Sequence, residues 1–138
     1  IEELVEFVRA ASNSEEEFQQ AVQDLHQALD ISADKVSQKI PAKSTLVGQV
    51  DALIDTLYFT YGSFVLMGVD PERIFEIVHQ ANMGKIFPDG KAQFDPVTHK
   101  ILKPEGWEEK YAPEPAIKKE LARQIRAYER HKERKNKQ

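Results

Sequence analysis

The stretch from Thr45 to Met67 constrains the fold more than any other part of the chain. It is almost wholly apolar, aromatic or small, and it contains no proline. Its glycines, Gly48 and Gly62, are each tolerable in a helix at a cost of about 1 kcal/mol. We therefore expect one long helix over residues 45–67. Because apolar positions surround most of it, we expect this helix to be the central and most buried element.

Two carboxylates, Asp51 and Asp55, lie within this apolar stretch. On a helix, Asp55 is about 40° round from Asp51, whereas Gln49, Thr56 and Thr60 lie on the opposite side. An ionised carboxylate removed from water needs a proton, a basic side chain or a metal ion. Salt bridges to Lys or Arg, or a helix less buried than its composition suggests, are the simplest explanations for such a pair taken alone. A metal site is the alternative.

A second acidic cluster, "IEELVE", favours the metal site. It arranges Glu2, Glu3 and Glu6 as EExxE, with Glu2 and Glu6 one helical turn apart. Exposed helix faces often carry such glutamates. Facing Asp51 and Asp55 across a bundle, however, the five carboxylates would form an oxygen-only site suited to Mg²⁺ or Mn²⁺. The chain has no cysteine, and its four histidines are scattered, which excludes thiolate sites and disfavours a ferritin-like di-iron site.

The remaining sequence predicts further helices joined by one long loop. Ser14 and Glu17 have the form of a capping box, which opens a helix ending at about Asp30. Residues 31–44 lack a sustained period and predict a connector with about one helical turn around Ala33 to Lys39. Three more helices are expected: one over residues 1–11, one from Asp70 as N-cap to a stop at Gly84, and one from residue 116 onward. Residues 86–115 are rich in proline, glycine and lysine, and they predict an irregular loop with a small hairpin near residues 92–102.

The fold class that follows is an all-α helical bundle with a long irregular loop, built as a single domain over residues 1–138. No apolar run approaches the roughly 20 residues that cross a bilayer, so we expect a cytoplasmic protein and no membrane partner. The chain begins at Ile1, already in helical register. We therefore expect a further segment upstream.

Charge is distributed unevenly along the chain. Residues 1–62 hold eleven acidic and four basic side chains, whereas residues 116–138 hold three acidic and nine basic ones. The simplest interpretation of the basic end is a solvated helix terminus followed by a basic tail. On these counts we do not expect nucleic acid as a partner.

The combination of EExxE, "DTLYFTYG", "VHQANMGK" and "KILKPEGW" resembles the all-α nucleoside triphosphate pyrophosphohydrolase superfamily. This superfamily includes MazG-like enzymes, dimeric dUTPases and phosphoribosyl-ATP pyrophosphohydrolases. The resemblance covers nearly the whole chain, interrupted by residues 12–44, which look like an enlarged insertion. It implies a MazG-like bundle and a hydrolase that cleaves a nucleoside triphosphate between the α- and β-phosphates, with house-cleaning of unwanted nucleotides as its role.

The resemblance also implies roles for particular residues. Glu2, Glu3, Glu6 and Asp55 would hold Mg²⁺, with Glu3 or Glu6 as the general base. Phosphate contacts are implied for Asn82, Lys85, Lys100 and Lys103, with solubility of the loop as the alternative role of the lysines. Trp107 could stack on a base, although anchoring the loop to the bundle is the simpler role for it.

One position departs from the family pattern. The glutamate expected three residues before Asp55 is Ala52, and Asp51 lies about 100° away around the helix. Asp51 either substitutes for that glutamate or the site lacks a ligand. A catalytically weakened nucleotide-binding or regulatory protein is therefore the alternative function, and a purely structural bundle with salt-bridged acids is a third.

The apolar surface of residues 45–67 also predicts self-association. A helix that is apolar nearly all round needs more covering surface than one chain of 138 residues readily provides. We therefore expect a homodimer, or a dimer of dimers, with helices packed across a two-fold axis.

Overall fold

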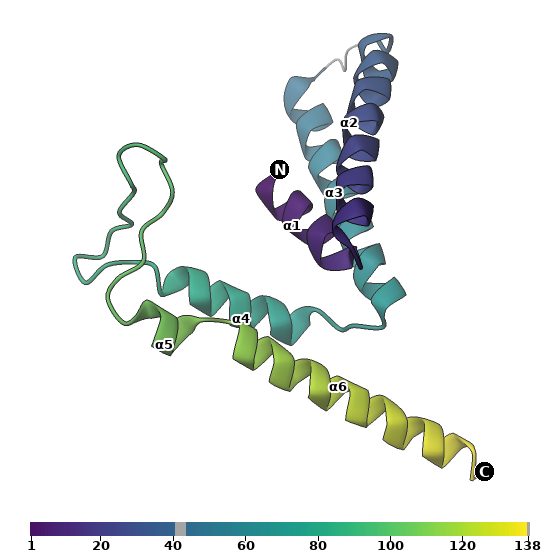
Figure 1. Ribbon diagram of the computed structural model, residues 1–138, viewed down its shortest axis with the longest axis vertical. Helices are drawn as coiled ribbons and strands as arrows, with labels where there is room; N and C mark the ends of the chain where they lie inside the picture. The colour runs from purple at the N-terminus through teal and green to yellow at the C-terminus, as the bar shows by residue number, and fades with distance from the viewer. Residues whose placement is uncertain (41–43, 138) are drawn as a thin grey trace. The chain divides into compact units, whose positions relative to one another are not determined.

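The protein is described by a computed structural model covering residues 1–40 and 44–137 (Figure 1). These residues form the helices α1 (Glu2–Ala11), α2 (Glu15–Ser37), α3 (Thr45–Met67), α4 (Glu72–Met83), α5 (Trp107–Tyr111) and α6 (Glu114–Lys135). Two isolated antiparallel bridges are the only β-structure in the described part of the chain. The all-α fold class is therefore confirmed. The chain divides into two compact units, residues 1–49 and 50–138, which are described separately.

In the first unit, α1 packs against the beginning of α2. The Arg9 guanidinium lies 4.9 Å from the centre of the Phe18 ring, and its Nη1 donates to Glu15 Oε2 at 2.7 Å. The predicted capping box is present, because the Ser14 hydroxyl oxygen accepts a bond from the Glu17 backbone N–H. The Glu17 carboxylate in turn accepts the Asn13 backbone N–H at 2.7 Å. Together these bonds fix the turn between the two helices.

Helix α2 is longer than the sequence predicted. It continues through Ser37 rather than ending at about Asp30, so residues 31–37 of the expected connector are helical. The physical reason is that these residues contain no glycine or proline, and an established helix adds residues at low cost. Residues 41–43 of the same connector lie outside the described part of the chain.

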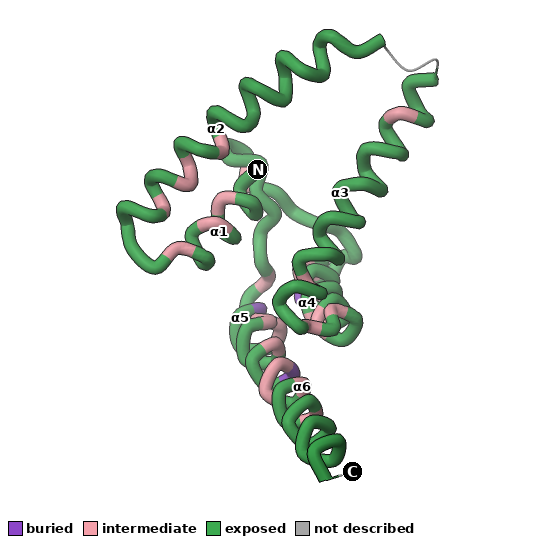
Figure 2. Tube along the Cα trace, turned by 90° about the vertical axis from the view of Figure 1, so that its right-hand side faces the viewer, coloured by how far each residue is buried: buried purple, intermediate pink, exposed green. Residues whose placement is uncertain are grey.

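Helix α3 has the predicted bounds but not the predicted burial. None of its residues is buried, and Tyr58, Phe59 and Val65 are each at least 75% exposed (Figure 2). The prediction that this helix is the most buried element is wrong for the chain alone, because burial requires a packing partner as well as apolar side chains. The hydroxyls of Thr56 and Thr60 donate to backbone carbonyls four residues earlier in the helix, each at 2.8 Å.

In the second unit, α4 and α6 lie side by side and run in opposite directions (Figure 1). The Gln124 side chain of α6 bonds both the N–H and the carbonyl of Asp70, at 3.0 and 2.9 Å, just before α4. The Asp70 carboxylate accepts the Glu72 N–H, so it caps α4 as predicted, although the helix begins one residue later, after Pro71. Gly84 follows the last residue of α4, as expected.

The loop between α4 and α5 contains the predicted hairpin. Antiparallel bridges join Ile86 to Ala92 and Phe94 to Ile101. At the hairpin's turn, Asp95 Oδ1 accepts the backbone N–H groups of Val97 and Thr98 and the hydroxyl of Thr98. These donors, with the Thr98 N–H first, hold the pKa of Asp95 below its usual value. Among the described residues, no helix combines the length and hydropathy needed to cross a membrane.

Candidate active site

In the first unit, the EExxE residues lie on one helix, as the sequence predicted. Glu2 and Glu3 are in the first turn of α1 and Glu6 is in the next, and all three side chains are exposed. Val5 and Val8 are partly covered, and Glu3 and Glu6 lie on the other side of the helix, whereas Glu2 lies between the two sides, about 60° round from Val5. Packing of α1 through these valines leaves Glu3 and Glu6 pointing away from the helix's covered side, with Glu2 at its edge.

In the second unit, Asp51 and Asp55 lie one turn apart on α3, and both are exposed. Neither carboxylate forms a salt bridge with any described residue. The salt-bridge explanation for this pair therefore fails within the chain, whereas the other simple explanation, a helix less buried than its composition suggests, holds for the chain alone. Ala52 lies between them, and its carbonyl accepts the Thr56 hydroxyl while its methyl side chain offers no metal ligand.

The predicted carboxylates are thus gathered as two groups, one in each compact unit. Within each unit taken alone, no three described His, Asp or Glu side chains lie close enough together to hold a metal ion. The five-carboxylate arrangement stays a prediction from the sequence.

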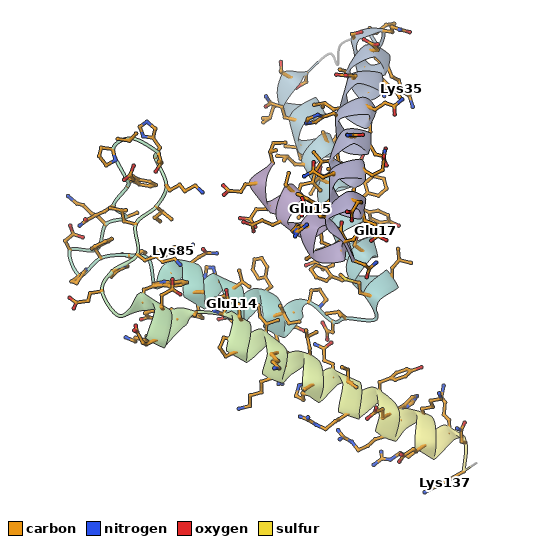
Figure 3. All side chains as sticks on the ribbon, in the orientation of Figure 1. Glu15, Glu17, Lys35, Lys85, Glu114 and Lys137 are labelled. Carbon is orange, nitrogen blue, oxygen red and sulfur yellow. The ribbon has the colours of Figure 1, made fainter. Side chains whose placement is uncertain are left out.

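Two of the predicted phosphate-binding lysines converge on Trp107. Its ring is 6% exposed, and its Nε1–H donates to the Ala81 carbonyl of α4 at 3.0 Å. The Lys103 ammonium lies 4.1 Å from the ring centre and the Lys85 ammonium 5.7 Å, both within cation–π range. Trp107 therefore anchors the loop to α4, as the simpler interpretation held. It also gathers positive charge at the loop end of α4, where Figure 3 shows Lys85.

The other two predicted residues differ in their placement. Asn82 lies beside these two lysines, because its Oδ1 accepts a bond from Lys85 Nζ at 2.8 Å. Lys100 lies on the hairpin instead, where its carbonyl accepts the Asp95 N–H at 2.9 Å. We call Asn82, Lys85 and Lys103 the lysine cluster. Glu108, which accepts a bond from Lys103 at 2.6 Å, lowers its net charge by one.

Tyr111 is a site residue that the sequence reasoning missed. Its ring packs directly on Gly84, where an added Cβ would lie only 2.6 Å from ring carbons. This contact closes α5 over the end of α4 and lines a cavity of about 240 Å³ with Met83 and Trp107. The sequence offers only Gly84 after "NM" and Tyr111 shortly after "PEGW" as signals. Their spacing does not reveal that the two residues are in contact.

The comparisons agree with this organisation. The phosphoribosyl-ATP pyrophosphohydrolase family profile matches residues 1–82, which include both carboxylate groups. A crystal structure from Exiguobacterium sp. 255-15, of a protein assigned as an NTP pyrophosphohydrolase, is 40% identical to this chain with a TM-score of 0.78. The match covers 92% of this chain and 75% of that one. No curated protein matches the chain.

The family match spans more than half of the chain, and the structural match extends the likeness through the loop and α6. The chain therefore belongs to the phosphoribosyl-ATP pyrophosphohydrolase family, of the MazG-like superfamily, and is a hydrolase acting on pyrophosphate bonds.

Proposed function

We propose that the protein is a Mg²⁺-dependent nucleoside triphosphate pyrophosphohydrolase with a house-cleaning role. It converts ribo- or deoxyribonucleoside triphosphates to the monophosphate and pyrophosphate. The observation that carries this proposal is the pair of carboxylate groups, EExxE on α1 and Asp51 with Asp55 on α3, both within the segment that matches the family. Neither Asp51 nor Asp55 forms a salt bridge with a described residue, so both exposed carboxylates are available to a cation.

The donor set fits a hard divalent ion. All five side chains offer carboxylate oxygens, which Mg²⁺ prefers and Mn²⁺ also accepts. Glu2, Glu3, Glu6 and Asp55 would hold the ion, with Asp51 as the replacement for the glutamate absent at Ala52. When bound, Mg²⁺ supplies charge neutralisation and orientation for the polyphosphate.

The remaining chemistry falls to the chain's own side chains. A water oxygen attacks the α-phosphorus, the bond from that phosphorus to the α–β bridging oxygen breaks, and pyrophosphate leaves. Glu3 or Glu6 accepts the proton of the attacking water as general base. The lysine cluster supplies two ammonium groups and an amide for phosphate oxygens.

The test is pyrophosphate release from a panel of ribo- and deoxyribonucleoside triphosphates, with and without Mg²⁺. Asp55→Asn keeps the side chain's shape but removes its charge, and we expect it to abolish release. Asp34→Asn is the matched control, because Asp34 is an exposed acid on α2 outside both carboxylate groups. Equal release by both variants would exclude Asp55 from the site.

Ala52 motivates a second candidate function. If Asp51 does not replace the absent glutamate, the protein binds nucleotide without efficient turnover and acts as a regulatory protein. Absence of release from every nucleotide, together with a Mg²⁺-dependent rise in melting temperature, would favour this candidate, because a ligand held only by the folded state stabilises it.

We propose further that the protein is a cytoplasmic homodimer or dimer of dimers. The support is the exposed surface of α3, on which Tyr58, Tyr61 and Val65 are 77%, 59% and 77% exposed and line one concave patch. Contiguous apolar surface of this kind marks an interaction site in soluble proteins. A second copy is the occupant that the family relationship favours.

A further inference from the structure

Helix α6 carries a line of basic side chains that the reaction does not use. Lys119, Arg123, Arg126, Arg130 and Arg134 recur at intervals of three or four residues, and all five are exposed. On a helix these positions fall within about 80° of arc and extend for about 23 Å. We call this set the basic stripe. It places roughly one cation on each helical turn of a single face.

The basic stripe lies beside the side of α6 that packs on α4, and all of its cations are exposed. Glu120, which is buried, and Gln124, which bonds Asp70 beside α4, lie about 80° and 120° round the helix from the middle of the stripe. Packing of α6 along α4 therefore leaves the stripe facing solvent. Along α6, the stripe runs away from Lys85 and toward Lys137 at the end of the described chain (Figure 3).

Most of the stripe's charge is not neutralised within the protein. Arg123 is paired with Glu120, through bonds of 2.6 and 2.8 Å. No salt bridge to a described residue involves the other four cations. Two acids, Glu129 and Glu133, lie on one flank of the stripe and reduce its charge without interrupting the line.

A regular line of cations suits a regular line of anions. Arginine forms bidentate bonds with phosphate, and three of the four unpaired members of the stripe are arginines. The stripe contains no aromatic residue, so it offers no surface for base stacking, which single strands normally require. An α-helix enters the major groove of B-DNA, which is about 12 Å wide, but not the narrow major groove of an RNA duplex.

A second copy of the chain fits the stripe less well. The acidic helix α2 presents Glu16, Asp30 and Asp34 on one side, but glutamines fill the turns between Glu16 and Asp30. We propose that α6 binds the phosphate backbone of double-stranded DNA through the basic stripe, without reading base sequence. The number of basic residues alone favoured a solvated helix end. Their alignment on one face of the helix is the observation that favours DNA.

The experiment compares two triple variants that lose the same charge. Arg126→Gln, Arg130→Gln and Arg134→Gln remove the last three cations of the stripe. Lys118→Gln, Lys132→Gln and Lys135→Gln remove three exposed cations from other sides of the same helix. Binding of a fluorescein-labelled 24-base-pair DNA duplex is measured by anisotropy between 25 and 200 mM salt, with helicity checked by circular dichroism.

We expect the stripe variant to bind at least about tenfold more weakly than wild type at low salt, and the control variant less than about threefold. The slope of log affinity against log salt should become shallower by about 3 in the stripe variant, because each lost phosphate contact changes it by about 0.9. Nucleotide hydrolysis should be unchanged in both variants, which separates this proposal from the proposed enzymatic function.

Three results would overturn the proposal. Wild type that does not bind the duplex at 25 mM salt excludes DNA as the ligand. Equal weakening in the two variants shows diffuse charge attraction rather than a stripe. A change of sedimentation coefficient in the stripe variant, without DNA present, assigns the stripe to a contact between copies of this chain.

Discussion

At position 52 the chain carries a methyl group where the family pattern has a carboxylate, and this residue tests the metal site most directly. Ala52 precedes Asp55 by three residues on α3, so the two positions lie on neighbouring sides of the helix. We expect Ala52→Glu to lower the Mg²⁺ concentration for half-maximal pyrophosphate release by about tenfold, the scale on which altered metal surroundings change affinity. Release is measured across a Mg²⁺ titration.

Ala28→Glu on α2 is the control for added charge, because Ala28 is also an exposed helical alanine. It should leave the Mg²⁺ requirement unchanged. An unchanged requirement in Ala52→Glu as well would mean that Asp51 already provides the oxygen that the pattern lacks.

Substitution by alanine should have opposite effects on stability at Gly84 and at Gly62. A Cβ at Gly84 would meet the Tyr111 ring at 2.6 Å, whereas one at Gly62 meets nothing within 4 Å. Gly84→Ala should therefore lower the free energy of unfolding by about 1–3 kcal/mol through overpacking. Gly62→Ala should raise it by up to about 1 kcal/mol, because alanine favours the helix interior. Urea unfolding measures both, and a neutral Gly84→Ala would show that Tyr111 moves aside at no cost.

At the scale of elements, Gln124 is the clearest link between α4 and α6. Its amide both accepts from the Asp70 N–H and donates to the Asp70 carbonyl, and it also donates to Glu120 Oε1 at 3.0 Å. Gln124→Ala removes these bonds and should cost about 1–3 kcal/mol of unfolding free energy in urea titrations. Gln80→Ala, which removes one bond within α4, should cost less than about 0.5 kcal/mol. Equal losses would show that the link between the helices adds nothing.

Glu120 makes the same element sensitive to acid. Bonds from Arg123, then from Gln124, lower the pKa of this carboxyl from 4.5 to about 2. A pKa lowered in the folded state adds stability that is fully present above pH 4.5 and is lost as the pH falls toward 2. Glu120→Gln has no carboxyl that titrates at this position. The difference in free energy of unfolding between wild type and variant should therefore shrink as the pH falls from 4.5 toward 2. A difference that stays constant between pH 6 and 2.5, measured by urea unfolding, would contradict the assignment.

Element positions were largely predictable from the sequence because their signals are local. The proline-free apolar run gave α3 its bounds, and the capping residues Ser14 and Asp70 marked the starts of α2 and α4. The predicted end of α2, at about Asp30, was too early. Residues 31–37 contain no glycine or proline, so nothing in them stops the helix. The burial of α3 could not be predicted in the same way, because it depends on which surfaces meet and not on the pattern of one helix.

The candidate site was predictable to a similar degree. Helical periodicity put Glu2 with Glu6 and Asp51 with Asp55, since each pair is one turn apart. The gathering of Lys85 and Lys103 around one indole was not predictable, because the two residues are far apart in the loop and their ring contacts depend on how the loop folds. Contacts between distant residues of a loop leave no period in the sequence.

At the scale of the whole molecule, a dimer gives the apolar surface of α3 a reason to exist. Tyr58, Phe59, Tyr61 and Val65 line a shallow concave patch on this helix, and aromatic residues of this kind are enriched in protein interfaces. A charge placed at Val65 would then be buried without a partner when two copies associate. Removal of one member of a buried ion pair, which leaves the same unpaired charge, costs about 3–5 kcal/mol.

Val65→Glu should accordingly raise the dissociation constant of the dimer by at least about 100-fold, which sedimentation velocity detects as monomer at micromolar concentration. Val97→Glu is the matched control, because Val97 is equally apolar and 83% exposed, compared with 77% for Val65, but lies at the hairpin's turn. It should sediment like wild type. A Val65→Glu protein that remains dimeric would place the interface elsewhere, whereas a monomeric wild type would leave the exposed face of α3 to a different partner. In either case the covering of α3, rather than its sequence pattern, decides whether this helix becomes part of a core.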